Sequence, residues 1–381
     1  MTVLHFTLPH QPNLGGLYVS QNAFRKVSGG KIVEIVSTRD TNKTEGDYKL
    51  QFWGLEFLDK RYGIPFGLSF PININQFFSE LRSLDVSLII IHSLFHYHAV
   101  IGYLFAKKYN IPYIFVPHGT LDPYVFSSNS LKKRLWLKLV GQSLIENASS
   151  VVVSALKEKE KASEILKNVQ VDVCSWGVEI PDLSETQSWR LEMRHKLGID
   201  SETKILLFLG RINKMKRPLE TALAFQALKP KGWKFIVVGY PENKELLSKI
   251  NSKCDPNYIT CYPPVEGQDK WKLLAASDAF VNLSYRENFG RSAIEAAALG
   301  LPTLISDGVD LYPDLEIASA AKIVHFNKNE SLIDGLSEFL NLTPHELRKI
   351  GNNGRDLVFS KFTIESFENK LSEIINRYSV F

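Results

Sequence analysis

Cysteine is scarce in this chain, and long apolar runs are missing. Its three cysteines, Cys174, Cys254 and Cys261, include no C-x-x-C pair. An odd number without that spacing suits a reducing compartment and argues against a zinc knuckle. No apolar run is long enough to span a bilayer, and the start of the sequence lacks a basic segment followed by an apolar core. We therefore expect a cytoplasmic protein.

Two common nucleotide-binding motifs are also missing. The loop HQPNLGG does not match G-x-G-x-x-G, and Gly29-Gly30-Lys31 lacks the rest of a P-loop. Dinucleotide binding and ATP hydrolysis thus have no motif to support them. The net charge is only +4, so nucleic acid is not an expected partner. We find no internal repeat and no low-complexity tract.

The length and the order of the apolar segments predict two α/β domains. A chain of 381 residues is too long to fold around one compact core, so we expect two domains of roughly 150 to 200 residues each. Short apolar segments alternate with helical patterns in both halves, which is typical of doubly wound parallel sheets. Ser175–Pro181 and the polar stretch after it indicate the boundary, giving domains 1–180 and 181–362. A final amphipathic helix is expected from Thr363 onward.

The expected strands are short and apolar. In the first domain they are Val3–Leu8, Ile32–Ser37, Val86–Ile91, Tyr113–Val116 and Ser149–Ala155. In the second domain they are Lys204–Gly210, Lys234–Gly239, Tyr258–Tyr262, Ala279–Leu283 and Thr303–Ser306. Open α/β folds bind ligands beyond the carboxyl ends of their strands, so side chains at these ends are the candidates for a site.

Polar residues follow three strands of the first domain. Gly15 and Gly16 come after the first strand and could let the backbone approach a ligand, although a tight turn explains them equally well. His92 and His118 each follow a strand, where an imidazole can exchange hydrogen bonds with a ligand hydroxyl. An ordinary histidine in a surface loop is the alternative for His118. A metal site is not expected, because no carboxylate or cysteine stands at ligand spacing near the HSLFHYH run that begins at His92.

The segment Leu131–Ile145 predicts a basic amphipathic helix. Three lysines and one arginine flank Trp136 and several leucines. This composition is compatible with a helix that lies on an anionic membrane surface. An ordinary solvated helix is equally compatible with the pattern.

Two cations stand in the first turn of the second domain, GRINKMK. Arg211 and Lys216 follow a strand, and Pro218 is well placed at the start of the next helix. Both cations would reach the crevice beside a helix N-terminus, where a diphosphate could bind. Solvated loop residues are the alternative.

The segment Glu287–Gly300, ENFGRSAIEAAALG, joins a loop to a short helix. Ser292 and Glu295 fit the S-x-x-E capping box and predict the helix N-terminus there. The amides of that terminus, its dipole and Arg291 would favour a phosphate. The carboxylates of Glu287 and Glu295 could accept hydrogen bonds from sugar or ribose hydroxyls, although capping alone would also explain Glu295.

Three motifs together resemble the retaining glycosyltransferases of family four. They are PHG at Pro117–Gly119, GRINKMK at Gly210–Lys216, and the E-x7-E element ENFGRSAIE followed by A-A-L-G-L-P. The resemblance covers nearly the whole chain. It implies the GT-B fold, in which two Rossmann-like doubly wound domains face each other across a cleft and the final helix, here about residues 363 to 381, packs back on the first domain.

The resemblance also implies roles for the candidate residues. Arg211 and Lys216 would neutralise the diphosphate, and Glu295 would bind the ribose. Glu287 and His118 would lie beside the donor sugar. Further substrate contacts are expected in the glycine loop, at a strand-end histidine, near the base and along the loop that opens the helix, namely at Gly15, Gly16, His92, Val265, Glu266, Asn288, Phe289, Gly290, Arg291 and Ser292.

The chain departs from the family pattern in two places. It has Trp176-Gly177-Val178 where Asn-Gly-Val is common, and it has Lys214 and Arg217 where proline and glycine are frequent. The second departure leaves the shape of the phosphate loop open.

The expected activity is transfer of a hexose from a UDP- or GDP-linked sugar to a hydroxyl of a glycan or lipid-linked glycan, with the anomeric configuration retained. Neither a metal nor a cofactor is expected, because the nucleotide sugar is the substrate. Cell-surface polysaccharide synthesis, at the inner face of a membrane contacted through Leu131–Ile145, would fit. A nucleotide-sugar epimerase or hydrolase, and a non-catalytic nucleotide-sugar binding protein, are the alternatives.

Overall fold

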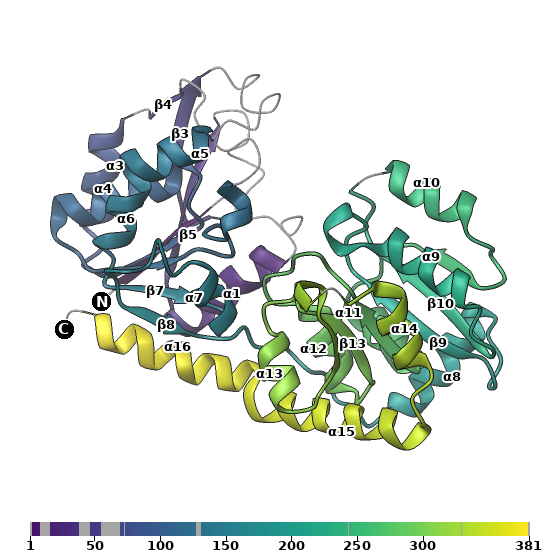
Figure 1. Cartoon of the computed structure of the whole chain (residues 1–381). Helices are drawn as coiled ribbons and strands as arrows, with labels where there is room; N and C mark the ends of the chain where they lie inside the picture. Colours follow the sequence, from purple (N-terminus) through teal and green to yellow (C-terminus); the bar gives the residue numbers. More distant parts are fainter. Residues whose placement is uncertain are drawn as a thin grey trace. The chain divides into compact units, whose positions relative to one another are not determined.

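The chain forms two compact α/β units (Figure 1). The computed structural model describes residues 2–7, 16–37, 46–54, 69–71, 73–126, 131–242, 244–328 and 330–379. The first unit comprises the chain up to Trp176 together with Phe367–Phe381, and the second comprises Gly177–Ser366. In both units helices alternate with mostly parallel strands, which confirms the predicted fold class.

The first unit contains an almost wholly parallel sheet. Its strands are β1 (Thr2–Thr7), β2 (Lys31–Ser37), β3 (Tyr48–Gly54), β4 (Ser69–Pro71), β5 (Val86–His92), β6 (Tyr113–Val116), β7 (Ser150–Val153) and β8 (Val171–Val173). They lie in the order β4-β3-β2-β1-β5-β6-β7-β8, and only β4 is antiparallel to its neighbour. The order reverses between β1 and β5, so the crevice of this sheet lies beyond their carboxyl ends.

The five strands expected in this unit are present, and β3, β4 and β8 are additional. Leu8, at the end of the first expected strand, lies outside the described residues, as does Gly15.

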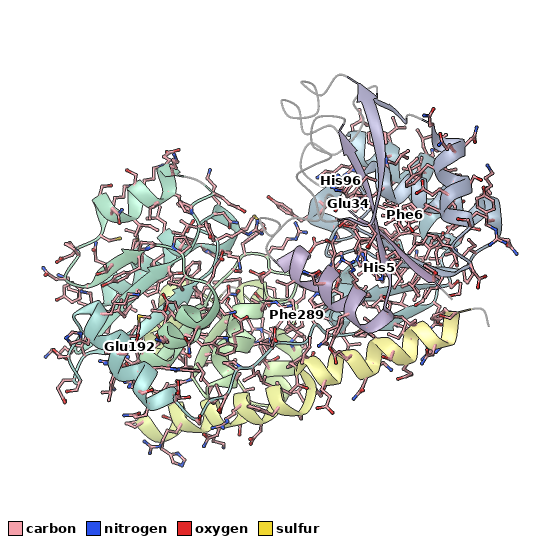
Figure 2. All side chains as sticks on the ribbon, turned by 180° about the vertical axis from the view of Figure 1, so that it is seen from behind. His5, Phe6, Glu34, His96, Glu192 and Phe289 are labelled. Atoms are coloured by element: carbon pink, nitrogen blue, oxygen red, sulfur yellow. The ribbon has the colours of Figure 1, made fainter. Side chains whose placement is uncertain are left out.

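Helices cover both faces of this first sheet. They are α1 (Gly16–Ser28), α3 (Ile74–Arg82), α4 (Tyr97–Tyr109), α5 (Leu131–Trp136), α6 (Gln142–Glu146), α7 (Leu156–Lys161) and α16 (Ile364–Tyr378). Side chains alternate along a strand, so Phe6 packs toward Phe105 of α4, while the neighbouring His5 lies on the opposite face and packs toward His92. Figure 2 labels His5 and Phe6 among the side chains of the chain. That second face is also covered by Phe24 of α1, whose ring meets His92 edge-on.

The basic helix expected at Leu131–Ile145 is present but irregular. After α5 the chain forms a π-helical turn, Leu137–Gly141, and then continues as α6. A Cβ at Gly141 would come within 2.8 Å of the Trp136 ring, so the glycine leaves room for the buried tryptophan. Among the helices described, none combines the length and the apolar character needed to cross a membrane.

The second unit contains a wholly parallel sheet in the order β11-β10-β9-β12-β13-β14. Its strands are β9 (Lys204–Leu209), β10 (Trp233–Val238), β11 (Ile259–Tyr262), β12 (Ala279–Asn282), β13 (Thr303–Ser306) and β14 (Lys322–Val324). The five expected strands are confirmed. The order reverses between β9 and β12, so the crevice lies where GRINKMK and ENFGRSAIE begin.

Helices again lie on both faces of the second sheet. They are α8 (Thr186–Leu197), α9 (Pro218–Leu228), α10 (Lys244–Lys253), α11 (Gly267–Ala276), α12 (Arg291–Ala298), α13 (Tyr312–Ile317), α14 (Leu332–Leu340) and α15 (Pro344–Lys361). One core joins β9 and β10 to α9, α10 and α14 through Phe208, Phe225, Phe235, Ile250 and Phe339. On the other face α8 contacts α11, and α12 contacts α15.

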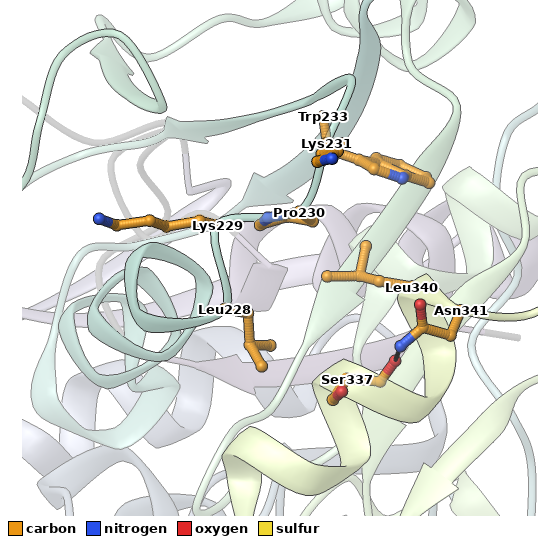
Figure 3. A pocket seen from close by; sticks show the side chains of 8 residues that line it. All are labelled: Leu228, Lys229, Pro230, Lys231, Trp233, Ser337, Leu340 and Asn341. Carbon is orange, nitrogen blue, oxygen red and sulfur yellow. Dashed lines mark hydrogen bonds between the residues drawn. The ribbon is translucent and has the colours of Figure 1, made fainter.

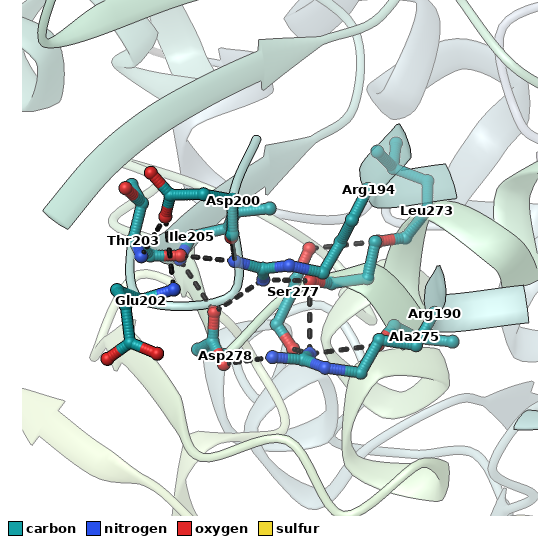
Figure 4. Close-up of polar contacts among 11 residues, drawn as sticks. Arg190, Arg194, Asp200, Glu202, Thr203, Ile205, Leu273, Ala275, Ser277 and Asp278 are labelled. Carbon is teal, nitrogen blue, oxygen red and sulfur yellow. Dashed lines mark hydrogen bonds and ion pairs between the residues drawn. The ribbon is translucent and has the colours of Figure 1, made fainter. Parts of the chain in front are cut away.

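A polar network at Asp278 ties α8 to the sheet (Figure 4). The Asp278 carboxylate accepts hydrogen bonds from Arg190 at 2.6 Å, from Arg194 at 3.2 Å and from the backbone N–H of Ile205 at 2.8 Å. Arg190 also donates to the last carbonyls of α11, which lack partners within their own helix. The network therefore fixes two helices and the start of β9 together.

The final helix, α16, belongs mainly to the first unit. Phe367 packs against Phe24 and Trp176, with ring centroids 5.7 and 5.9 Å away. Arg377 donates to Asp172 at 2.9 Å. The chain thus leaves this unit after Trp176 and supplies part of its core again at the C-terminus.

Candidate functional site

The loop after β9 packs closely against the loop after β10. Gly239 has φ 155°, and a Cβ there would lie 1.7 Å from the carbonyl oxygen of Gly210. The Gly210 N–H donates to Val238, and the Ile212 N–H donates to Tyr240 at 2.8 Å. Only glycine allows this approach, which holds the loop carrying the two predicted cations at the carboxyl edge of the sheet.

Lys216 and Glu287 form an ion pair in this crevice. The Asn213 side chain accepts a hydrogen bond from the Lys216 N–H at 3.0 Å and fixes the short turn that carries the lysine. The Glu287 N–H donates to Gly308 at 2.8 Å, within a short bridge between Glu287 and Val309. The paired side chains are 13% and 19% exposed. Because an ammonium has three donors, Lys216 can hold Glu287 and an anion at once.

Arg211 lies in a more open position. It forms an ion pair with Glu242, and the two side chains are 65% and 40% exposed. Asn213 donates to the same carboxylate at 2.7 Å. A pair this exposed contributes only about 0–1 kcal/mol, so Arg211 can turn toward another anion at little cost. The structure thus brings Lys216, rather than Arg211, to Glu287.

The capping box predicted at the start of α12 is wrong. The N-cap is Gly290, with φ 76°, and α12 begins at Arg291 without a side-chain cap. Because glycine adopts this left-handed conformation readily, the chain enters the helix before Ser292. Glu295 is buried and accepts a hydrogen bond from Lys270 of α11 at 2.7 Å. Glu295 therefore does not cap α12.

Arg291 and Phe289 are held by neighbours within the second unit. Arg291 donates to the carbonyl of Gly177 at 3.2 Å. Burial lowers the pKa of Arg291, and the nearby charge of Glu295 opposes that shift. Phe289 is buried and packs edge-on against Phe362, so it can offer a ligand its backbone amide but not its ring.

The region predicted to lie near a base is joined to the loop after β10. Glu266, which follows Val265, occupies the N-cap position of α11. The Tyr240 hydroxyl donates to the Glu266 carboxylate at 2.8 Å. Sequence reasoning missed Tyr240 and Lys270, because neither belongs to a motif; position after a strand end was the available signal for Tyr240.

His118 follows β6 in the first unit and is partly exposed. Its φ of 51° turns the chain sharply, and the next N–H, of Gly119, donates to Glu158 at 2.9 Å. Glu158 also accepts the Ser154 N–H and hydroxyl, and burial raises the pKa of Glu158. Burial lowers the pKa of His118 to about 3, so its imidazole is neutral at neutral pH.

His92 lies behind His118 and is fully buried. Its Nδ1 lies 3.0 Å from Nε2 of His118, and its Nε2 lies 3.2 Å from Nδ1 of His5. Direct contact between His92 and a ligand stays a prediction. In the structure, His92 contacts His118, the partly exposed residue in front of it. Gly16 is the first residue of α1. In the part of the chain described, no three His, Cys, Asp or Glu residues are arranged to hold a metal ion.

A surface pocket of about 370 Å³ lies elsewhere in the second unit (Figure 3). Lys229, Trp233 and Leu340 contribute to its lining. Trp233 begins β10, so the pocket lies at the amino edge of the sheet, away from the crevice at the carboxyl ends.

Comparison with known proteins points to one class of enzyme. The family model for glycosyl transferases group 1 matches residues 190–357. The chain is 24% identical over 286 residues to alpha-monoglucosyldiacylglycerol synthase of Acholeplasma laidlawii, covering 71% of this chain and 70% of that protein. It is 24% identical over 234 residues to D-inositol 3-phosphate glycosyltransferase of Mycolicibacterium vanbaalenii, covering 56% of this chain and 51% of that protein. The chain thus spans about half the length of the latter relative.

Solved structures show the same fold over nearly the whole chain. Sucrose-phosphate synthase from Thermosynechococcus elongatus has a TM-score of 0.76 at 17% identity, covering 99% of this chain and 98% of that one. Anabaena HepE in complex with UDP and glucose has a TM-score of 0.74 at 15% identity, covering 99% of each chain. The fold is GT-B. The family match and the curated relatives thus make this chain similar to group 1 glycosyltransferases.

Proposed function

We propose that this chain transfers a hexose from a nucleoside diphosphate sugar to an acceptor hydroxyl and retains the anomeric configuration. The observation that carries the proposal is the shielded Lys216–Glu287 pair at the switch point of the second sheet. A lysine beside a helix N-terminus suits a diphosphate, and a fixed carboxylate suits sugar hydroxyls. Both residues lie inside the matched segment, 190–357.

The donor is a UDP or GDP sugar in this proposal. The Anabaena relative was solved with UDP and glucose, which supports a uridine nucleotide. Glu295, buried beside Lys270, would bind the ribose hydroxyls. The base would lie near Val265 and Glu266, at the start of α11.

In the proposed reaction the bond from the anomeric carbon to the diphosphate breaks, and a bond to the acceptor oxygen forms on the same face. The departing phosphate oxygen takes the acceptor proton, so neither an enzyme nucleophile nor a metal is needed. Negative charge grows on the leaving group as the bond breaks. Lys216, Arg211 and the first amides of α12 would stabilise that charge more in the transition state than in the ground state.

The proposed acceptor is a glycan or lipid-linked glycan used in cell-surface polysaccharide synthesis. Leu131, Leu135 and Leu139 recur every four residues and are 82%, 55% and 68% exposed. Exposed Arg134 and Lys138 lie in the same stretch, so this leucine row could rest on an anionic membrane. The similarity to the Acholeplasma alpha-monoglucosyldiacylglycerol synthase supports a lipid acceptor. We place the enzyme in the cytoplasm, at the inner membrane face.

The test follows donor turnover with a panel of UDP and GDP sugars, with and without lipid-linked acceptors and with a chelator present. Acceptor-dependent nucleotide release and a product with the donor's anomeric configuration, by NMR, are expected. Release without acceptor would identify a hydrolase or epimerase instead. Tight donor binding without turnover on any acceptor would identify a binding protein, and loss of activity with chelator would contradict metal independence.

A further inference from the structure

A row of three imidazoles crosses the first sheet toward its carboxyl edge. His5 lies on β1, His92 ends β5, and His118 follows β6. His5 pairs with Ile90, two residues before His92, and His92 pairs with Val116, two residues before His118. Steps of two residues keep side chains on one face of a sheet. The pairing of the strands therefore places the three rings side by side.

The three rings, which we call the histidine row, meet edge to edge. The His5 and His92 centroids are 5.5 Å apart with planes at 15°, and the His92 and His118 centroids are 5.3 Å apart at 21°. In both pairs the centroid separation exceeds the nitrogen–nitrogen distance by about 2.3 Å, so the two nitrogens lie close to the line between the centroids. That is the geometry of in-plane N–H···N hydrogen bonds.

The far end of the histidine row is closed by Ser28, at the end of α1. Its hydroxyl lies 2.7 Å from Nε2 of His5. The Gly30 N–H donates to the same hydroxyl at 3.0 Å, and a Cβ at Gly30 would come within 2.5 Å of the His5 ring. Glycine at position 30 therefore leaves the space in which His5 and Ser28 meet.

Two arrangements of the ring protons are possible along the histidine row. A neutral imidazole carries one N–H and one lone pair, so each ring that donates on one side accepts on the other. If Ser28 donates to His5, then His5 donates to His92, His92 donates to Nε2 of His118, and the His118 proton sits on Nδ1. If His5 donates to Ser28, every bond reverses, and Nδ1 of His118 carries a lone pair.

The contacts of Ser28 favour the first arrangement. In the reversed one the hydroxyl would have to donate to the carbonyl of Arg25 at 3.4 Å, which is longer than a normal O–H···O bond. Donation to His5 at 2.7 Å is the better bond. Among the described residues Nδ1 of His118 has no hydrogen-bond partner, so its N–H is available to a ligand.

We propose that Ser28, His5 and His92 are positioning residues that fix the neutral ring of His118 with its proton on Nδ1, as a donor toward an oxygen of the bound sugar. The ligand in this inference rests on the proposed function, whereas the tautomer does not. His118 is further held by the Trp176 ring, 5.6 Å away at 30°, and the carbonyl of His92 accepts from His98.

The test records nitrogen chemical shifts of the full chain with ¹⁵N-labelled histidine, without substrate, using His118→Asn for assignment. We expect a protonated Nδ1 and an unprotonated Nε2 for His118. Ser28→Ala should change this pair of shifts although Ser28 does not touch His118. Ser83→Ala is the control, because Ser83 also ends a helix and bonds a carbonyl three residues earlier.

A His118 proton on Nε2, or shifts unaffected by Ser28→Ala in a folded variant, would overturn the inference. In the transfer assay Ser28→Ala should lower kcat by about 2- to 10-fold, the equivalent of one neutral hydrogen bond, with little change in donor KM. Ser28→Thr keeps the hydroxyl and should restore the rate. An inactive chain with the expected tautomer would count against the proposed function alone.

Discussion

At the scale of single residues, glycine determines where the candidate site can form. Gly290 enters α12 at φ 76°, and a Cβ there would lie 2.9 Å from a Val309 methyl. Val309 in turn forms the bridge that holds Glu287. The position of the helix N-terminus and the position of the carboxylate therefore depend on the same small residue.

Gly290→Ala should destabilise the second unit more than Gly232→Ala. Both positions have positive φ, 76° and 74°, but nothing lies within 4 Å of a Cβ at Gly232. The control should lose about 1–2 kcal/mol from the left-handed backbone alone. Gly290→Ala should lose about 1–3 kcal/mol more through overpacking. Calorimetric melting of the two variants, compared on the same transition, checks this difference, and equal losses would contradict it.

The residue scale also shows the limit of sequence reasoning. Lys216, Glu287 and Glu295 were named from motif and strand-end position, and the structure does bring the first two into contact. The capping box failed because glycine's backbone freedom competed with serine's side chain, and sequence alone does not decide that competition. Lys270 was missed because its partnership with Glu295 is made across two helices.

At the scale of elements, Asp278 and two arginines fix α8 against α11 and β9. The Arg194 side chain is only 7% exposed, and it donates to Asp278 and to backbone carbonyls, including that of Ala276. Glu192 and Lys272 join the same two helices by a surface pair in which the glutamate is 59% exposed. The Arg194 bond to Ala276 and the Glu192–Lys272 pair are thus a buried and an exposed link between α8 and α11.

Arg194→Met should destabilise the second unit by about 3 kcal/mol, because it removes the buried hydrogen bonds that this guanidinium donates to Asp278 and to the carbonyls of Asp200 and Thr203. Glu192→Ala should cost no more than about 1 kcal/mol. Denaturant unfolding of both variants measures the difference. A loss from Arg194→Met no larger than that from Glu192→Ala would show that the Asp278 network does not hold the helix.

Most strands were predictable because buried parallel strands are short, apolar and bounded by turn residues. β3, β4, β8 and β14 were missed, since they lie at or beside the edges of their sheets, where the pattern is less continuous. The π-helical turn before α6 has no periodic signature either. It follows from the packing of Trp136 over Gly141, which is a tertiary contact.

At the scale of the whole molecule, the chain repeats one plan twice. Each unit has a sheet whose strand order reverses, at β1 and β5 in the first and at β9 and β12 in the second, and each places its candidate residues after the carboxyl ends there. This plan was predictable from the alternation of elements. The histidine row was not predictable, because His5 lies inside an apolar strand and its contact with His92 depends on the pairing of β1 with β5.

The leucine row is the surface that we expect to meet a membrane. Replacing Leu131, Leu135 and Leu139 with serine should reduce binding to anionic vesicles at least about tenfold, because burying one exposed leucine contributes about 1.5–3 kcal/mol. Co-sedimentation with phosphatidylglycerol and phosphatidylcholine vesicles measures this. The control replaces Leu191 and Ile317, which are 64% and 87% exposed in the second unit. Equal losses in both variants, or no vesicle binding at all, would contradict the membrane face.

The central claim is that Lys216 holds the diphosphate of the donor, and calorimetric titration of UDP and GDP into matched variants tests it most directly. Lys214 is the control, because it is exposed on the same short turn. Lys216→Ala should weaken nucleotide binding by about 10- to 100-fold, the loss of one charge-assisted contact, whereas Lys214→Ala should leave it within about twofold. Unchanged affinity in a folded Lys216→Ala variant would contradict the account.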